Sequence, residues 1–298
     1  MLGQGPFGVG RRGRLMSAAV ACLAGCALSG PGALLARGAS GAAGSQTGVP
    51  ATGPAVLGPC ADPQLHLRCP DLVMSAPFDV HVDRTSLAGH VLLRAASSVN
   101  NLGAGPLELR AHRRGTGGWI VEQAIYGRGG RRHLFESDGQ LVFKFVPGYR
   151  YGHPTIGGYS YWKFREVAAF QLWTIDARFR TVHLARVGPK VDYCLRDLIR
   201  THPTARSPVD PVYPACSQNP RLHRDVLGTS VRWSDVYPDE YPQQWIDVTG
   251  LRGRFAFVMI ADPRDALQES NKDNNASMTY VELPSGGIIG HGVGLPAP

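Results

Sequence analysis

Residues 243–283, QQWIDVTGLRGRFAFVMIADPRDALQESNKDNNASMTYVEL, carry the clearest strand pattern in the chain. The run RFAFVMIA at 254–261 is short, apolar and rich in aromatic and β-branched residues, and MTYVEL at 278–283 has a similar character. Short runs of this kind, bounded by Gly, Pro, Asn or Asp, are typical of β-strands. The stretch therefore predicts two strands joined by a polar connection.

The polar connection between these two runs contains Asn271, Asp273, Asn274 and Asn275. Such residues favour turns, because their short side chains bond to nearby backbone groups. A calcium loop is the alternative, but the spacing lacks the acidic order and the distal Glu of an EF-hand. We therefore expect a structural turn.

Similar runs recur through the rest of the chain at 72–82, 90–99, 107–112, 119–126, 141–146, 164–175 and 181–187. Nine short strands, together with 37 Gly and 23 Pro, favour an all-β fold, and a β-sandwich is the simplest arrangement. The segment 191–243 shows no strand pattern. A loop of that length in a compact domain is usually functional or pinned by a disulfide.

The net charge of +8 arises mainly from arginine, because only four of the 31 basic residues are lysines. The arginines are scattered, and no basic stripe with interleaved aromatics is visible, so we expect no nucleic-acid partner. Motifs of common hydrolases, metalloproteases and nucleotide-binding proteins are absent from the sequence. The crowded acids Asp235, Asp239 and Glu240 leave general acid/base catalysis as a minor alternative to a solvated loop.

The N-terminus resembles an export signal. Arg11, Arg12 and Arg14 precede the apolar run LMSAAVACLAGCALSG, and the first 59 residues contain no Asp or Glu. Within that run, Leu-Ala-Gly-Cys ending at Cys26 has the form of a lipobox, which predicts a signal peptide at 1–26 and a lipid-anchored protein. The alternative is ordinary cleavage near Ala36 or Ala39. Both place the folded part outside the cytoplasm, secreted or anchored at the cell surface.

The mature chain divides by composition into three parts. Residues 27–59 are a Gly, Ala and Pro-rich segment that predicts a flexible linker, 60–284 hold the folded domain, and 285–298 form a C-terminal tail. A membrane would be reached only through the lipid anchor. The expected partner is an unidentified extracellular protein or a component of the cell envelope.

Four cysteines remain after the leader, an even number that suits an oxidising compartment. They allow three pairings, of which sequence proximity favours Cys60 with Cys69 and Cys194 with Cys216. A metal site is the weaker alternative, because no Cys-x-x-Cys spacing occurs.

Several segments together resemble the lysyl oxidase family, in the family's order, over about residues 69–284. They are CPDLVMSAPFDV at 69–80, VLLRAASSVNNLGAGPLEL at 91–109, and the stretch from Gln244-Trp245-Ile246-Asp247 to the Glu-Ser and Asn-Asn run that precedes the last strand. The resemblance implies a lysyl oxidase-like β-sandwich with long, disulfide-pinned loops. It also implies a copper amine oxidase that converts lysine ε-amines to aldehydes through a lysine tyrosylquinone.

The resemblance assigns the two quinone-forming positions to residues of this chain. GPKVDYCLRD at 188–197 is similar to the family's lysine segment and places Lys190 at the quinone lysine, with Tyr193 for the family's Phe. Counting back from Trp245 places Tyr237 at the quinone tyrosine, with Tyr241 as a near neighbour.

The copper ligands are where the sequence departs from the family. The family's His-x-His-Trp-His strand corresponds to YSYWKF at 159–164, so Tyr159, Tyr161 and Lys163 occupy the three ligand positions. Copper(II) prefers imidazole, and a lysine ammonium repels a dication. We therefore expect no cofactor, and a degenerate member that acts as a binding or structural surface protein. The alternative is an active copper-dependent protein-lysine 6-oxidase, which retention of Lys190 and Tyr237 favours.

Overall fold

The computed structural model describes residues 58–298 except 116–117, 151–152, 190, 295 and 297–298. By its contacts the chain divides into Met1–Gly53 and Pro54–Pro298, and every described residue belongs to the second unit. The predicted leader, Cys26 and most of the linker lie outside the described residues. In the described part, no helix has the length and apolar character needed to cross a membrane.

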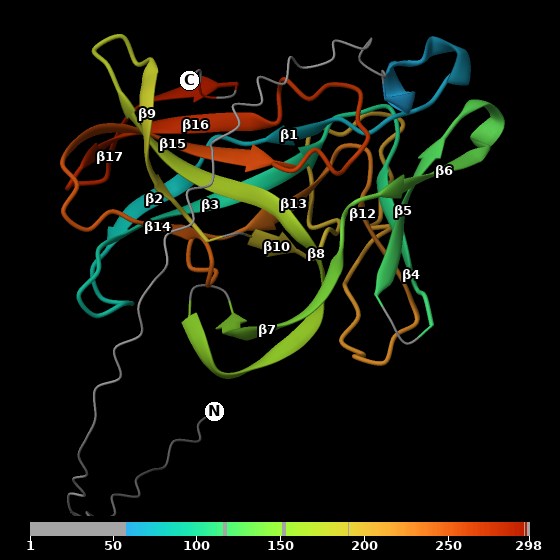
Figure 1. Cartoon of the computed structure of the whole chain (residues 1–298), viewed down its shortest axis with the longest axis horizontal. Coiled ribbons are helices and arrows are strands. Elements are labelled where there is room, and N and C mark those ends of the chain that lie inside the picture. The colour runs from blue at the N-terminus through green and yellow to red at the C-terminus, as the bar shows by residue number, and fades with distance from the viewer. Residues whose placement is uncertain (1–57, 116–117, 151–152, 190, 295, 297–298) are drawn as a thin grey trace, which may run out of the picture. The chain divides into compact units, whose positions relative to one another are not determined.

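The described chain is all-β, as the sequence predicts, and its strands form three antiparallel sheets (Figure 1). The first sheet contains β1 (Leu72–Met74), β2 (Phe78–Asp83), β3 (Leu92–Asn101), β11 (Ile199–Arg200), β13 (Trp233–Tyr237) and β14 (Trp245–Asp247). The second contains β7 (Leu141–Arg150), β8 (His153–Ile175), β9 (Thr181–Val187), β10 (Val191–Tyr193), β15 (Gly253–Ala261), β16 (Ala276–Leu283) and β17 (Gly287–Val293).

The third sheet is smaller. It contains β4 (Leu107–Arg113), β5 (Trp119–Tyr126), β6 (Arg132–Ser137) and β12 (Arg224–Thr229). The described helices are single 3-10 turns, η1 (Pro59–Ala61), η2 (Pro63–Leu65) and η3 (Arg128–Gly130).

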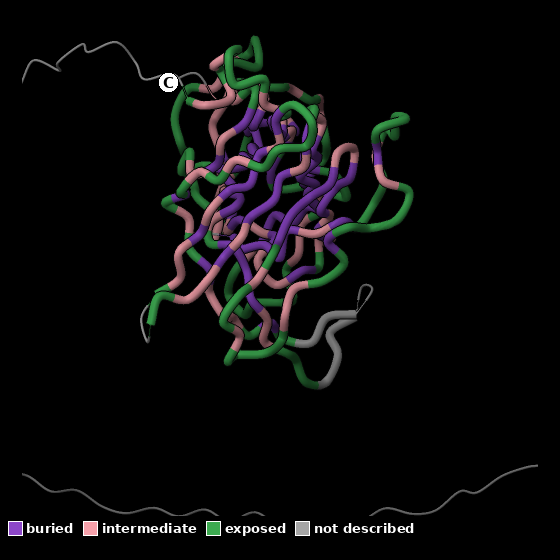
Figure 2. The backbone as a smooth tube through the Cα atoms, turned by 90° about the vertical axis from the view of Figure 1, so that its right-hand side faces the viewer, coloured by how far each residue is buried: buried purple, intermediate pink, exposed green. Residues whose placement is uncertain are grey.

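The main core lies between the first two sheets, so the domain is a β-sandwich. Leu93 of β3, Phe170 of β8 and Phe257 of β15 are fully buried members of one apolar cluster. β3 is buried along its whole length, because β2, β14, β1 and β13 pair along it and the second sheet covers it. Figure 2 shows this buried centre with exposed loops around it.

β8 is the longest strand and organises the second sheet. Its first part pairs with β7, and its second part pairs with β9 and β15. Glu166 has a φ of 54°, in the left-handed region, and the register of β8 against β10 shifts between Val191 and Tyr193. This irregularity resembles a β-bulge, which changes the direction of the side chains that follow it.

Three expectations from the sequence need correction. The run 72–82 is two strands, since Pro77 lies in the break between β1 and β2 and has no backbone N–H to donate to a ladder. The segment 191–243 contains β10 to β13, which pair with distant strands and are stabilised by those partners. The sheet also continues past residue 284, because β17 pairs with β16.

The favoured disulfide pairing is confirmed: Cys60 bonds to Cys69, and Cys194 bonds to Cys216. The polar connection before β16 is a turn of the expected kind, in which Asp273 N donates to Asn271 Oδ1 at 3.1 Å. Asn274 Nδ2 donates to Asp71 Oδ1 at 2.9 Å, which ties the turn to the start of the domain.

Glu269 follows β15, is buried, and connects the start of β1 to the turn before β16. Its Oε2 accepts from Leu72 N at 2.9 Å and its Oε1 accepts from Asn275 Nδ2 at 2.7 Å. Burial raises the pKa of Glu269 from 4.5 to about 8, although both hydrogen bonds oppose the shift. The folded protein therefore retains a proton on this carboxyl that the unfolded chain has released.

We expect this proton to make stability fall with rising pH. The contribution of this proton to the free energy of unfolding is complete below pH 4.5 and is lost as the pH rises through 8. The expected loss is about 3 to 5 kcal/mol. Glu269→Gln, which cannot titrate, should flatten this part of the curve. Urea unfolding of both proteins across that range measures the effect. Parallel curves would show that Glu269 titrates normally.

Candidate functional site

The three residues that the resemblance assigns to the family's copper-ligand positions lie in a row on one face of β8. The rings of Tyr159 and Tyr161 have centroids 5.5 Å apart, and Lys163 Nζ lies 5.0 Å from the centroid of Tyr161. Tyr159 is 50% exposed, whereas Lys163 is completely buried. The row therefore runs from the surface into the core, and its buried end carries an ammonium group.

Lys163 is held by two tyrosine hydroxyls. Its Nζ donates to Tyr241 Oη at 2.6 Å, and the hydroxyls of Tyr161 and Tyr241 lie 2.7 Å apart. Burial lowers the pKa of Lys163 to about 8, and the neighbouring charge of Lys144 lowers it further, while Asp192 and Asp235 oppose the shift. A cation thus already occupies the centre of this site near neutral pH.

Asp235 is a buried acid close enough to Tyr161 and Lys163 to affect their pKa values. It is fully buried on β13, and neither carboxyl oxygen has a hydrogen-bond partner among the described residues. Burial raises its pKa well above the usual value, against the positive charges of Arg196 and Lys163. Burial thus favours the neutral form of this carboxyl.

Tyr237, the candidate quinone tyrosine, ends β13 and is almost fully buried. Its ring stacks on Tyr193 with centroids 3.8 Å apart, and its hydroxyl accepts from Cys194 N at 2.9 Å. Tyr193 is anchored in turn by Ser97 at 2.8 Å and Gln244 at 2.9 Å. Lys190 lies outside the described residues, so its position relative to Tyr237 is not part of this geometry.

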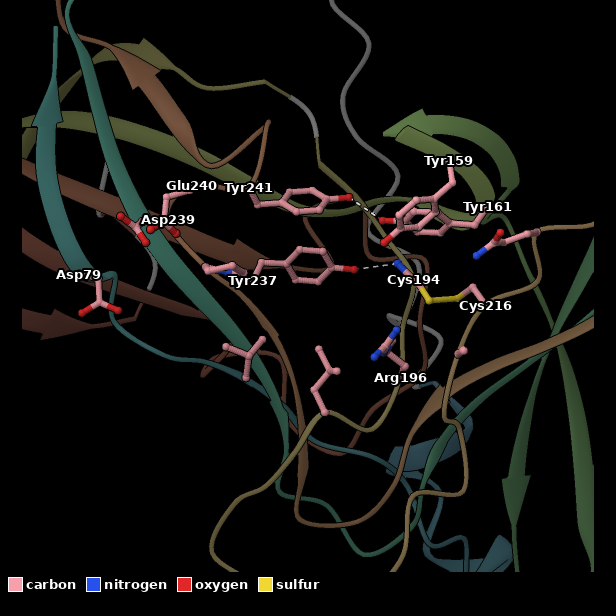
Figure 3. A pocket seen from close by; sticks show the side chains of 15 residues that line it. Asp79, Tyr159, Tyr161, Cys194, Arg196, Cys216, Tyr237, Asp239, Glu240 and Tyr241 are labelled. Atoms are coloured by element: carbon pink, nitrogen blue, oxygen red, sulfur yellow. Dashed lines mark hydrogen bonds between the residues drawn. A yellow bond between two sulfur atoms is a disulfide. The ribbon is translucent and has the colours of Figure 1, made fainter. Parts of the chain in front are cut away.

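A cavity of about 840 Å³ opens beside these tyrosines. Figure 3 shows Tyr237 and Tyr241 extending into it from one side and Tyr159 and Tyr161 from the other. The Cys194–Cys216 disulfide forms part of its wall. The four rings leave room for a ligand much larger than a metal ion.

One end of the cavity is acidic. Asp79, Asp239 and Glu240 line it, and Asp239 Oδ2 lies 3.0 Å from His81 Nδ1. Burial raises the pKa of Asp239, and its hydrogen bond and charge contact with Glu240 raise it further, while His81 opposes the shift. A cation beside these two carboxyls would oppose this shift.

Arg196 lies away from these acids, near the disulfide and the hydroxyl end of Tyr237 (Figure 3). Its Nε is buried and has no hydrogen-bond partner among the described residues. The cavity therefore combines a positive group and a cluster of acids at separate points of an aromatic wall.

The side chains of Tyr159, Tyr161 and Lys163 do not fit copper. Burial raises the pKa of the Tyr161 phenol to about 12, and the Lys163 ammonium would repel a dication. No group of three or more His, Cys, Asp and Glu side chains suited to a metal ion occurs among the described residues.

Sequence reasoning assigned no role to two charged residues that line the cavity, Arg196 and Asp79. Arg196 lies inside the lysine segment, but nothing in its spacing pointed to the cavity. Asp79 has a φ of 50° and lies where the register of β2 shifts against β3, a feature with no sequence signature. Tyr241, considered only as a neighbour of Tyr237, is the residue that bonds both Tyr161 and Lys163.

The family model described as lysyl oxidase matches residues 159–288. The match begins at Tyr159 and contains Lys163, Tyr237 and most of the cavity lining, whereas the strands before β8 precede it. Residues 159–288 are therefore a lysyl oxidase family domain, and that family depends on copper and a lysine tyrosylquinone. No curated protein matches the chain.

Proposed function

We propose that this chain is an exported member of the lysyl oxidase family that works without copper and binds a ligand in its tyrosine-lined cavity. The observation that carries the proposal is the buried ammonium of Lys163, which lies 2.6 Å from Tyr241 Oη. The resemblance assigns this residue to one of the family's copper-ligand positions. A dication placed beside this group would be repelled, and the tyrosine hydroxyls already bond to it or to each other.

The cavity supports a binding role, since it is of the size of small-molecule sites and combines aromatic walls with few polar groups. The disulfide in its wall suits a protein that functions outside the cytoplasm. An extracellular protein or a cell-envelope component remains the proposed source of the ligand.

The test is to express the full chain with its leader in a copper-supplemented bacterial host, and to purify and dialyse the processed protein. We expect no stoichiometric copper by metal analysis, no visible quinone band, and an intact mass without a lysine–tyrosine cross-link. Incubation with a primary amine should release no peroxide.

Bound copper together with peroxide release would instead establish the active oxidase, in which Lys190 and Tyr237 form the quinone. Tyr237→Phe is the matched control for that outcome, because it keeps the ring that stacks on Tyr193 and cannot form the quinone. Activity that survives this change would come from a contaminant.

A further inference from the structure

The cavity holds two unlike charged regions whose arrangement restricts what can bind. Asp79, Asp239 and Glu240 lie toward the backbone end of the Tyr237 side chain, and Arg196 lies toward its hydroxyl end (Figure 3). These groups come from β2, from the turn after β13 and from the segment that follows the Cys194 half-cystine. The cavity can therefore contact opposite charges on one ligand at the same time.

The acidic end is suited to an ammonium group. Asp239 and Glu240 are adjacent in the chain and line the same end of the cavity, and a cation beside them would favour their ionised forms. His81 supplies the one ion-pair contact to Asp239 among the described residues, and its side chain is 46% exposed. An arriving ammonium would thus meet carboxylates that its own charge helps to ionise.

The opposite region is suited to a carboxylate. Arg196 has no salt bridge within 4.0 Å to a described acid, and its buried Nε has no hydrogen-bond partner among the described residues. A guanidinium presents a planar set of donors that matches the two oxygens of a carboxylate. The nearby Asp235 forms no salt bridge with it, and burial raises the pKa of that acid, which favours its neutral form.

The tyrosine rings between the two regions leave space for an aliphatic chain. The hydroxyls of Tyr161, Tyr237 and Tyr241 are already engaged within the protein, so these rings present mainly their faces and edges. Aromatic faces accept both methylene groups and the outer part of a cation. An apolar spacer would therefore lie between the charged groups of the ligand.

From these contacts we infer that the cavity binds ω-ammonium carboxylates, molecules in which a flexible apolar chain separates an ammonium group from a carboxylate. A peptide with a free C-terminal lysine has this chemistry, and so has a free ω-amino acid such as ε-aminocaproate. The inference rests on the proposed binding function and adds that the ligand carries a carboxylate. The ammonium lies among the acids and the carboxylate contacts Arg196.

Calorimetric titration of the purified full chain tests directly whether the ligand's carboxylate contributes to binding. The probes are a short peptide ending in lysine, the same peptide with its C-terminus amidated, ε-aminocaproate and hexylamine. We expect each carboxylate-bearing probe to bind about ten- to hundredfold more tightly than its partner without the carboxylate. Comparing the peptide with ε-aminocaproate distinguishes a ligand that is the C-terminus of a protein from one that is a small metabolite.

Two variants locate the charges. Arg196→Met should abolish the preference for the free acid over the amide, with Arg186→Met on the exposed edge strand β9 as its control. Glu240→Gln should weaken all four probes, with the exposed Glu136→Gln of β6 as its control. Thermal unfolding of each variant shows whether it is folded.

Equal affinity for acid and amide in the parent protein would overturn the inference, and so would failure of all probes to bind. Neither result would bring copper or peroxide release, which are the outcomes that overturn the proposed function. The two failures are therefore distinguishable in the same preparation.

Discussion

Replacing Tyr159, Tyr161 and Lys163 together by histidine is expected to create a copper(II) site with one ion per chain. The three side chains already lie in a row on one face of β8, within contact distance of one another. The change introduces three imidazoles and removes the repelling ammonium. We expect affinity to increase by about a thousandfold or more, which corresponds to about 4 kcal/mol. Dialysis against copper followed by metal analysis measures it.

The double variant Tyr159→His with Tyr161→His is the matched control. It supplies two imidazoles but keeps the Lys163 ammonium, so it should bind copper much more weakly than the triple variant. Electron paramagnetic resonance would report nitrogen ligation in the triple variant alone. If the triple variant bound no more copper than the parent, these residues would not occupy the family's ligand positions.

Lys163→Met is expected to change how stability depends on pH. The pKa of Lys163 is about 8 in the folded protein and 10.5 when unperturbed, so the unfolded chain holds its proton more tightly. The free-energy cost of burying the Lys163 ammonium is greatest below pH 8 and disappears as the pH rises to 10.5. Over that window the free energy of unfolding should rise by about 3 kcal/mol in the parent relative to the variant.

The difference between the two proteins is the quantity to measure, because tyrosines with raised pKa values titrate near the top of the same window and affect both. Methionine keeps most of the lysine stem, so a change in packing should be small. Urea unfolding at several pH values from 7 to about 10.5 supplies the curves. A constant difference would mean that Lys163 is not perturbed by burial.

Some strand bounds were predictable to the residue. β5 and β9 have the bounds expected from the sequence, and each is followed by a glycine. β15 and β16, which have the clearest pattern, begin one and two residues earlier than expected. β12, Arg224–Thr229, was not predictable, because RDVLGT has little strand character. It is a strand because it pairs with β4, more than a hundred residues earlier in the chain.

The row of site residues on β8 was predictable from the sequence and the resemblance together. The two-residue period of a strand places Tyr159, Tyr161 and Lys163 on a common face, and the resemblance says why that face matters. The cavity depends on contacts between distant segments instead. Arg196 and Asp79 reach it through a disulfide-closed loop and an irregular strand, and neither arrangement has a periodic signal.

The alternation of β8 also bears on how such a protein diverges. Trp162 and Phe164 alternate with the site residues and belong to the main core, and Trp162 packs against Trp119 of the third sheet with centroids 4.9 Å apart. The positions that build the core therefore alternate with the positions that form the site. Point changes at the site positions of this one strand could exchange metal ligands for an amine, or the reverse, while the side chains of the core face stay the same.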